Sequence, residues 1–388
     1  MTPAGPRCPP WRIHLVAAAR PNFMKVAPLF HALARHPDRF LPELVQAAQH
    51  ASANMSDDFR AEFGLPAPTH RIAAGGGSHA AQTAAIMVGY ERICVAARPD
   101  MAVVVGDVNA TLAAALAAAK LGIPLAHLEA GLRCGERSMP EEINRRVVDA
   151  IADLHWAPSH DAAANLVAEG VDGARIVCAG NVMVDCYEMM RARIAADPGP
   201  GRLGLTAGRY AIATFHRPAN VDRPEALAAL ANALRAAARR MEVVFPVHPR
   251  TKARLDGCGI GAALSVVPGL RLLEPLGYVP FMALLRAAAC VITDSGGIQE
   301  EAAHLRIPCL TLRDTTERPV TLVQGSNRLV RPEALGAALD AVLAGTHRVG
   351  DPPVLWDGRA AERMVASLGR WFAEAPSGVT SAAGPPAS

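Results

Sequence analysis

The sequence predicts an α/β protein made of two Rossmann-like, doubly wound domains. Three observations support this prediction. The chain has 388 residues, whereas single hydrophobic cores seldom grow beyond about 250–300 residues. Short apolar runs that are typical of buried parallel strands alternate with helical patterns. This alternation restarts after the turn-rich connection Asp197–Gly201, so we expect a second domain to follow it.

The first half of the chain starts with a strand and continues as a strand–helix alternation. The clearest strand is Met101–Val105, a continuous apolar run that ends at Gly106-Asp107 and precedes an alanine-rich helix. The other expected elements are strands at 13–19, 41–46, 124–128 and 154–157 and helices at 23–35 and 110–120. About six such units make an open sheet with helices on both faces.

The second half repeats this pattern. Its expected strands are residues 210–214, 243–247, 271–273, 289–293 and 308–312. We therefore expect an N-terminal tail (1–11), an N-terminal Rossmann-like domain (12–190), a C-terminal Rossmann-like domain (191–375) and a disordered tail (376–388). The final helix of the second domain can pack back on the first.

Composition excludes several classes of protein. Hydrophobic residues make up 51% and charged residues 19% of the chain, which allows a sizeable core. A net charge of +3 with dispersed basic residues does not favour nucleic acid or an anionic membrane surface as a partner. No apolar run is long enough to span a bilayer and no signal-peptide pattern opens the chain, so we expect a cytoplasmic enzyme.

The cysteines do not indicate a metal site. All eight are scattered singly, without CxxC pairs or a histidine at zinc spacing. We expect most of them to be reduced core residues. The cysteines therefore do not predict a structural metal.

The segment Asp294–Glu301 is the most informative motif. A buried strand runs into Asp294-Ser295-Gly296-Gly297, and a helix begins inside the motif. Small residues at such a junction leave backbone N–H groups and the positive end of the helix dipole open to a phosphate or diphosphate. The alternative is an ordinary helix start, in which serine and glycine serve only capping and turn geometry.

Polar residues recur where predicted strands end, and ligands of open α/β sheets bind at these ends. They are Arg20, Asp107, Glu129 and Glu141 in the first half and His216, Arg217, His248, Asp294, Arg313 and Thr316–Arg318 in the second. Carboxylates, histidines and arginines beside an anion-binding helix suit proton transfer next to a diphosphate leaving group. An acidic residue alone at a strand end is more often a helix cap or a salt-bridge partner, but recurrence at strand ends in both halves favours a functional site.

An ordered set of motifs resembles the non-hydrolysing UDP-N-acetylglucosamine 2-epimerases over roughly residues 12–372. The motifs are Arg20–Lys25, Gln49-His50, Gly106-Asp107, His127–Arg133, Pro140–Arg145, Phe215–Arg217, His248-Pro249, Asp294–Glu301, Thr316–Pro319 and Leu355–Arg363. The resemblance implies a GT-B-like fold with an interdomain cleft, in which the N-terminal domain is catalytic and the C-terminal domain binds UDP. It implies a homodimer that requires no metal and no cofactor. It also implies reversible conversion of UDP-GlcNAc to UDP-ManNAc for surface polysaccharide synthesis. In this family UDP is eliminated to give a 2-acetamidoglucal and is then added back.

The resemblance also implies roles for individual residues. The catalytic set is Asp107, Glu129, Glu141 and His216, and which of them removes the proton at C2 stays open. The substrate-binding set is Arg20, Lys25, Arg133, Arg217, His248, Phe281, Ser295, Gly296, Gly297, Glu301 and Arg313. Gln49 and His50 match positions that hold a second, allosteric UDP-GlcNAc.

Some motifs depart from the family pattern. The first loop reads Ala18-Ala19-Arg20-Pro21-Asn22 where Gly-Thr-Arg-Pro-Glu is commonest, and Pro319-Val320 lacks a frequent glutamate. A UDP-N-acetyl sugar with further modifications is therefore an open alternative. Others are a hydrolysing 2-epimerase that releases ManNAc and UDP, a glycosyltransferase, and a non-catalytic UDP-sugar-binding protein.

Overall fold

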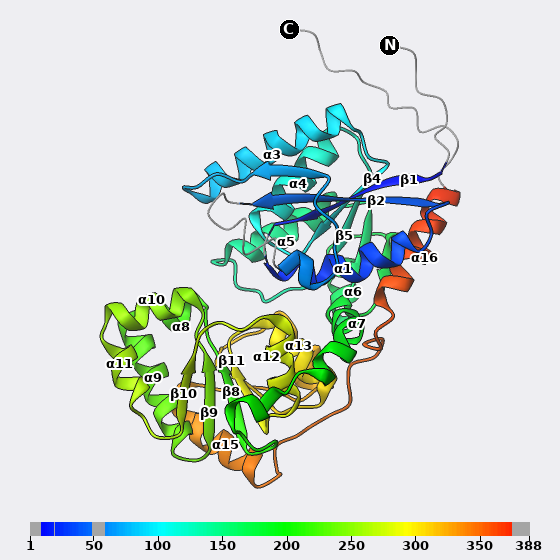
Figure 1. Cartoon of the computed structure of the whole chain (residues 1–388). Helices are drawn as coiled ribbons and strands as arrows, with labels where there is room; N and C mark the ends of the chain where they lie inside the picture. The colour runs from blue at the N-terminus through cyan, green and yellow to red at the C-terminus, as the bar shows by residue number, and fades with distance from the viewer. Residues whose placement is uncertain (1–8, 19, 49–58, 375–388) are drawn as a thin grey trace, which may run out of the picture. The chain divides into compact units, whose positions relative to one another are not determined.

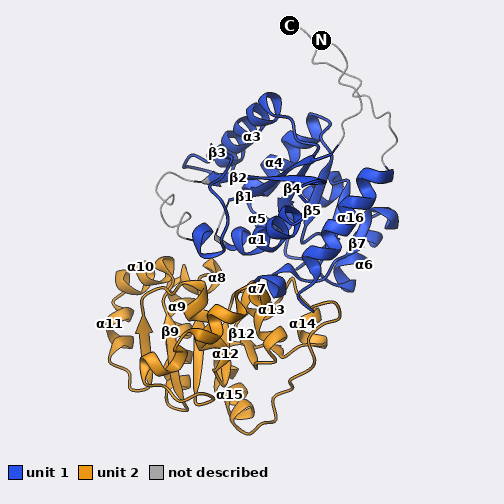
Figure 2. Ribbon diagram, turned by 45° about the vertical axis from the view of Figure 1, so that its right-hand side comes forward, with its two compact units in different colours: residues 1–186, 357–388 blue, residues 187–356 orange. Residues whose placement is uncertain are grey.

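The computed structural model describes residues 9–18, 20–48 and 59–374. The chain divides into two compact units, residues 1–186 with 357–388 and residues 187–356 (Figure 2). Helix α7 (Val182–Ala196) crosses this division, and the boundary expected between residues 190 and 191 lies inside that helix.

Among the described residues, the sheet of the first unit has seven parallel strands in the order β3-β2-β1-β4-β5-β6-β7. They are β1 (Trp11–Ala17), β2 (Phe40–Ala48), β3 (His70–Ala73), β4 (Met101–Val105), β5 (Leu125–Leu128), β6 (Leu154–Ala157) and β7 (Ile176–Cys178). Strands β4, β5 and β6 are buried along their whole length. Helices cover both faces of the sheet, which explains why these strands are continuous apolar runs.

Helices of the first unit lie on both sides of its sheet (Figure 1). On one face α3 (His79–Ala96), α4 (Asn109–Lys120) and α5 (Pro140–Ile151) share an apolar cluster with the strands. The alanine-rich sequence of α4 lets this helix approach the sheet closely. On the other face, α1 (Arg20–Ala34) packs beside α16 (Ala360–Glu374). Helix α6 (His160–Ala168) and a short 3-10 turn (Gly173–Arg175) precede β7.

Helix α16 belongs to the first unit although it follows the whole second unit in the sequence. Asp185 accepts hydrogen bonds from the first amides of α16, at Ala360 (3.1 Å) and Ala361 (2.8 Å). Ser367 of the same helix accepts a hydrogen bond from the Trp156 indole at 2.8 Å. These contacts cap the helix and fix its buried face.

The sheet of the second unit has six parallel strands within the described residues, in the order β10-β9-β8-β11-β12-β13. They are β8 (Tyr210–Thr214), β9 (Glu242–Pro246), β10 (Leu270–Leu273), β11 (Cys290–Thr293), β12 (Cys309–Thr311) and β13 (Asn327–Leu329). The helices are α8 (Pro218–Val221), α9 (Pro224–Ala238), α10 (Pro249–Gly257), α11 (Ile260–Ser265), α12 (Tyr278–Arg286), α13 (Gly296–Leu305), α14 (Val320–Val323) and α15 (Leu335–Leu343), with 3-10 turns at Gly199–Leu203 and Pro332–Ala334.

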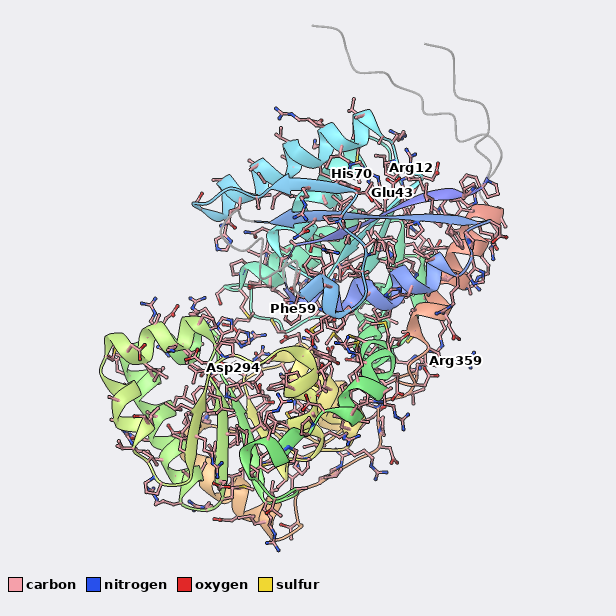
Figure 3. All side chains as sticks on the ribbon, viewed as in Figure 1. Arg12, Glu43, Phe59, His70, Asp294 and Arg359 are labelled. Carbon is pink, nitrogen blue, oxygen red and sulfur yellow. The ribbon has the colours of Figure 1, made fainter. Side chains whose placement is uncertain are left out.

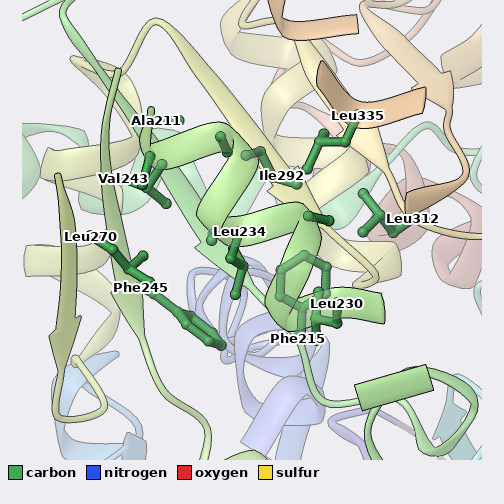
Figure 4. Close-up of a cluster of buried hydrophobic side chains, with 14 of the residues drawn as sticks. Ala211, Phe215, Leu230, Leu234, Val243, Phe245, Leu270, Ile292, Leu312 and Leu335 are labelled. Carbon is green, nitrogen blue, oxygen red and sulfur yellow. The ribbon is translucent and has the colours of Figure 1, made fainter. Parts of the chain in front are cut away.

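The core of the second unit lies between this sheet and α9. Figure 4 shows Leu230 and Leu234 of α9 among apolar side chains of the strands, such as Val243 and Phe245, with Leu335 of α15 nearby. These residues are almost completely buried. Their burial fixes the strands, and therefore fixes the loops that leave the strand ends.

Both sheets change winding direction at one place, between β1 and β4 in the first unit and between β8 and β11 in the second. Connections leave these neighbouring strands in opposite directions, so each sheet has a crevice beyond the carboxyl ends of the pair. The expected polar residues follow these strands. No helix in the described ranges is long and apolar enough to cross a membrane.

Candidate functional site

Two tight turns bring carboxylates to the switch point of the first unit. Gly106, after β4, has φ 67°, and Glu129, after β5, has φ 72°. The Gly106 amide donates to the Leu128 carbonyl at 3.0 Å, which joins the two strand ends. A Cβ on Gly106 would lie 3.3 Å from Glu129 Oε2. The glycine therefore leaves room for the Glu129 carboxylate against the turn.

Glu129 forms a buried ion pair with Lys25 of α1. Glu129 is only 4% exposed, and its Oε2 accepts a hydrogen bond from Lys25 Nζ. A left-handed conformation in a residue other than glycine costs about 1–3 kcal/mol and is found mainly where function requires it. The cation compensates a charge that would otherwise be costly to bury.

Asp107 is held by α5. Arg145 of that helix is 2% exposed and contacts both the Asp107 carboxylate and, at 2.7 Å, the buried carboxylate of Glu142. Asn144 Nδ2 donates to the Asp107 carbonyl at 2.8 Å. The Asp107 side chain is still 33% exposed, so its orientation is fixed while it stays accessible. Glu141 lies partly buried in the first turn of the same helix.

Hydrogen bonds of His127 and Asp149 stabilise the two turns. His127 contacts Asp149 Oδ1 at 2.6 Å through Nδ1 and the Gly106 carbonyl at 2.9 Å through Nε2. Asp149 Oδ2 accepts from the Gly131 amide at 3.0 Å. Burial opposes ionisation of Asp149, but His127 and Arg133 lower its pKa below the ordinary value. The network fixes the backbone on both sides of Glu129.

Arg133 belongs to this supporting network. Its guanidinium lies 2.7 Å from Asp149 and 2.6 Å from Glu169. The structure thus engages Arg133 with two acidic residues of its own unit, Asp149 and Glu169. Its expected role toward the substrate stays a prediction.

In the second unit, Asp294 joins the ends of β8 and β11. Its buried carboxylate accepts from the amides of His216 (3.1 Å) and Arg217 (3.0 Å) and from Asn220 Nδ2 (3.0 Å). The His216 ring also contacts Asp294, with Nδ1 at 3.2 Å. Burial alone would raise the pKa of Asp294, but these partners hold it below its usual value. Figure 3 labels Asp294 at this end of the unit's sheet. Asp294 therefore positions His216 and is itself fully engaged.

The N-terminus of α13 is crowded by charged side chains. Ser295 precedes the helix without a side-chain cap, and its amide donates to Thr293 Oγ1 at 2.9 Å. A Cβ on Gly296 would lie 2.6 Å from Arg318 Nη1 and 2.7 Å from Glu317 Oε1. Only glycine allows this approach, which combines the positive end of the helix dipole with a guanidinium group.

Three arginines surround Glu317. Its carboxylate lies 3.0 Å from Arg217, 2.7 Å from Arg313 and 2.6 Å from Arg318, and Arg318 also contacts Glu300 at 2.6 Å. Burial disfavours the charged form of Glu317, but the three guanidinium groups hold its pKa well below the ordinary value. Guanidinium groups outnumber carboxylates here, so the cluster suits an anionic ligand.

Glu301, His248 and Phe281 complete the expected set of the second unit. Glu301 of α13 is 4% exposed, and burial raises the pKa of its carboxyl to about 8. His248 caps α10 by accepting from the Arg250 amide at 3.2 Å, and its ring centre lies 5.5 Å from that of His216. Phe281 is partly buried on α12.

Three expected residues cannot be described in the same way. Arg20 is the first residue of α1, but its side chain lies outside the described part of the structure. The expected allosteric pair, Gln49 and His50, also lies outside the described residues.

Four further residues position the expected site residues: Arg145, Asp149, Glu317 and Asn220. Glu317 was expected as one of the polar residues that follow strands, but none of the four was given a role of its own. A signal was present for two of them, because Arg145 and Asp149 follow Glu141 at four-residue steps and therefore share one face of a helix. Glu317 lies in the connection between β12 and α14, and Asn220 lies in the four-residue helix α8, which is too short to show a periodicity.

The fold and the two switch points define a class of protein, the two-domain Rossmann-like proteins of GT-B-like architecture. The profile described as UDP-N-acetylglucosamine 2-epimerase matches residues 31–369. A relative named UDP-N-acetylglucosamine 2-epimerase from Methanocaldococcus jannaschii is 35% identical over 365 residues, which cover 92% of this chain and 98% of the relative. The chain belongs to the UDP-N-acetylglucosamine 2-epimerase family, and the predicted family and fold class are confirmed.

Two further comparisons describe the range of the family. A crystal structure of the M. jannaschii UDP-GlcNAc 2-epimerase in complex with UDP-GlcNAc and UDP has a TM-score of 0.85 and 34% identity, covering 92% of this chain and 99% of that one. A relative from Pseudomonas aeruginosa is named UDP-2,3-diacetamido-2,3-dideoxy-D-glucuronate 2-epimerase. It is 36% identical over 337 residues, which cover 86% of this chain and 90% of the relative.

Proposed function

We propose that the protein is a non-hydrolysing 2-epimerase that interconverts UDP-GlcNAc and UDP-ManNAc. Family membership supports the reaction type. The observation that carries the proposal is the pair of ion-paired carboxylates at the switch point of the first unit. Glu129 is held by Lys25 and Asp107 by Arg145, so two carboxylates are positioned for proton transfer.

The reaction needs a base at C2 and a stabilised leaving group at C1. When the C2 proton is removed, the electrons of the C–H bond form the C1–C2 double bond and those of the C1–O bond leave with UDP. The proton then returns to the opposite face of C2, and a UDP oxygen adds to C1 again. We assign these proton transfers to Asp107, Glu129, Glu141 and His216, without dividing the acid and base roles among them.

We assign the nucleotide to the second unit. The N-terminus of α13 and the arginines near Glu317 would stabilise the diphosphate as its charge develops. Glu301 would bind the ribose hydroxyl groups, and Phe281 would lie beside the uracil. Arg217, Arg313 and His248 complete the set that faces the nucleotide in this proposal.

A product assay tests the proposed reaction against its alternatives. Incubation with UDP-GlcNAc, followed by chromatographic separation, should give UDP-ManNAc with free UDP only in trace amounts. Accumulation of free ManNAc with UDP would instead identify a hydrolysing enzyme. Release of UDP only when a sugar acceptor is added would identify a glycosyltransferase, and no product at all would support a non-catalytic binding protein.

The name of the P. aeruginosa relative supports a second candidate substrate, because this relative is 36% identical to the chain and the M. jannaschii UDP-N-acetylglucosamine 2-epimerase is 35% identical. The unusual first loop, Ala18-Ala19-Arg20-Pro21-Asn22, gives an independent reason to test it. The assay should therefore compare UDP-GlcNAc with UDP-2,3-diacetamido-2,3-dideoxy-glucuronate. A kcat/KM that is at least about tenfold higher for the uronate would assign the protein to that subgroup.

We further propose that the enzyme is a cytoplasmic homodimer that supplies ManNAc-type sugars for surface polysaccharide, with Gln49 and His50 in an allosteric UDP-GlcNAc site. The resemblance supports each of these points. Light scattering tests the dimer. Sigmoidal dependence of the reverse reaction on added UDP-GlcNAc tests the allosteric site, and Gln49→Ala should abolish the sigmoidal dependence.

A further inference from the structure

Three potential metal ligands lie on neighbouring strands of the first unit. They are His14 of β1, Glu43 of β2 and His70 of β3, and we call them the His–Glu–His cluster. His14 pairs directly with Glu43, and His70 pairs with Val45, two residues beyond Glu43. Since side chains alternate between faces along a strand, all three point to the same face of the sheet. Figure 3 shows Glu43 and His70 close together, with Arg12 beside them.

The cluster is separate from the proposed active site. His14 is the fourth residue of the seven-residue strand β1, whereas the proposed catalytic residues follow the carboxyl ends of β4 and β5. The His14 ring is completely buried, and the side chains of Glu43 and His70 are 13% and 23% exposed. The mechanism proposed above uses none of these three side chains.

The distances in the cluster suit a shared metal ion. His14 Nε2 lies 3.2 Å and His70 Nε2 lies 3.5 Å from the same oxygen, Glu43 Oε2, and the three atoms all lie within 4.8 Å of one another. Ligand atoms around tetrahedral Zn²⁺ are about 3.3 Å apart, as metal–ligand bonds of about 2.0–2.1 Å require. Two of the three separations already match this value.

The surroundings fix the orientation of two ligands. His14 Nδ1 lies 3.3 Å from the hydroxyl of the buried Tyr90. This hydroxyl can accept a hydrogen bond from Nδ1–H, and in that tautomer the lone pair of Nε2 can bind a metal. Arg12 Nε lies 3.2 Å from Glu43 Oε1, the oxygen that faces away from the two imidazoles. Metal-binding histidines commonly have such a partner on the second ring nitrogen, and ligating carboxylates are held in the same way.

His70 provides a further observation. Its Nε2 atom is buried and has no hydrogen-bond partner within the described residues. A buried polar atom without a partner costs free energy, and a bound ion is one of the ordinary explanations. This nitrogen is the one that approaches Glu43.

We propose that the His–Glu–His cluster binds a divalent transition metal of the zinc class and so links the strands β1, β2 and β3. Imidazole and carboxylate ligands suit Zn²⁺ and Co²⁺ better than Mg²⁺, which prefers oxygen ligands alone. Three protein ligands leave a fourth position for water. The ligands come from three separate strands, with His14 and Glu43 already 29 residues apart, so no short motif in the sequence reveals the site.

The test uses the full chain, prepared without a histidine tag and freed of metal with a chelator. Zn²⁺ binding is measured by isothermal titration calorimetry, and Co²⁺ binding by its visible absorption. The wild-type protein should bind one equivalent of Zn²⁺, and Co²⁺ should give the intense d–d bands of a site with few ligands. Thermal unfolding should move to higher temperature in the presence of Zn²⁺.

Two ligand variants and one matched control complete the design. His70→Asn and Glu43→Gln should each weaken Zn²⁺ binding by at least about tenfold and abolish the thermal shift. His36→Asn changes an exposed histidine of the same unit and should behave like the wild type. The proposal fails if the wild-type protein binds no stoichiometric Zn²⁺, or if both ligand variants keep wild-type affinity. Because the two variants change different strands, misfolding of one leaves the other as a test.

Discussion

Glu129 combines burial, a left-handed backbone conformation and an ion pair with Lys25. Burial of the carboxylate and the left-handed backbone are each costly by themselves, and the ion pair with Lys25 offsets the first of these costs. Their coincidence at the end of β5, beside Gly106, is difficult to explain by stability alone. At the scale of single residues, Glu129 is therefore the strongest candidate for a direct role in the chemistry.

Replacing Glu129 by glutamine tests this role. Glutamine keeps the shape of the side chain but can no longer exchange a proton at C2, so kcat should fall by roughly 10²–10⁴-fold. Steady-state kinetics with UDP-GlcNAc measures the change. Glu91→Gln, at an exposed position of α3, is the control and should retain wild-type kcat. Near-native turnover of the Glu129 variant would remove this residue from the mechanism.

Glu301 should make stability depend on pH. Burial raises the pKa of this carboxyl from 4.5 to about 8, so the folded protein keeps a proton that the unfolded chain releases near pH 4.5. The free energy of unfolding should therefore decrease as pH rises between these two values, by at most about 1.4 kcal/mol per pH unit. Glu301→Gln should remove this contribution.

Urea unfolding without nucleotide, at about pH 5.5 and about pH 7.5, measures the Glu301 contribution. The Glu301 variant should lose less stability over this interval than the wild type. Glu333→Gln, at an exposed position of the same unit, serves as the comparison and should keep the wild-type decrease. Equal decreases in all three proteins would mean that Glu301 does not hold its proton in this range.

At the scale of elements, helix α13 begins at Gly296, where the close packing of charged side chains requires glycine. A Cβ on Gly296 would lie 2.6 Å from Arg318 Nη1 and 2.7 Å from Glu317 Oε1. Gly296→Ala should therefore displace the arginine cluster. We expect UDP affinity to fall by at least about tenfold, or about 1.4 kcal/mol, and stability to fall by about 1–3 kcal/mol.

Gly257→Ala is the matched control for this prediction. Gly257 ends α10, and a Cβ there would meet nothing within 4 Å. Alanine should change stability there by less than about 1 kcal/mol and leave UDP affinity unchanged. Calorimetric titration with UDP and denaturant unfolding measure both quantities. Similar affinities for the two variants would show that the start of α13 does not take part in nucleotide binding.

The elements that the sequence predicted are those with a strong local signal. The buried strand Met101–Val105 appears with the expected bounds, because five consecutive apolar residues followed by a turn leave little alternative. The strands β3, β7 and β13 were not expected. They are three or four residues long and lie at the edges of the sheets. Such short strands are defined by pairing with a neighbouring strand, because their own residues show no clear pattern.

The same distinction applies to the candidate site. Positions such as Asp107, Glu129 and His216 could be selected because polar residues directly follow apolar strands. The contacts that hold these residues could not be predicted, since Lys25–Glu129 joins residues 104 apart and Asn220–Asp294 joins residues 74 apart. Such pairs depend on the strand order, which brings β1 beside β4 and β8 beside β11.

At the scale of the whole molecule, each unit contributes a different chemistry at an equivalent place in its sheet. In the first unit, Glu129 pairs with Lys25 and Asp107 pairs with Arg145. In the second unit, the N-terminus of α13 lies beside the arginine cluster around Glu317. An epimerase that eliminates UDP needs both kinds of group, one for C2 and one for the diphosphate. The central claim is therefore that the chain breaks and re-forms the C2–H bond of a UDP-sugar.

Deuterium exchange tests this claim most directly. The protein is incubated with UDP-GlcNAc in deuterated water, and the C2 proton of both epimers is followed by NMR. We expect deuterium to enter C2 as UDP-ManNAc appears, and we expect Glu129→Gln to suppress exchange and epimerisation together. Formation of UDP-ManNAc with full retention of the C2 proton would contradict the account.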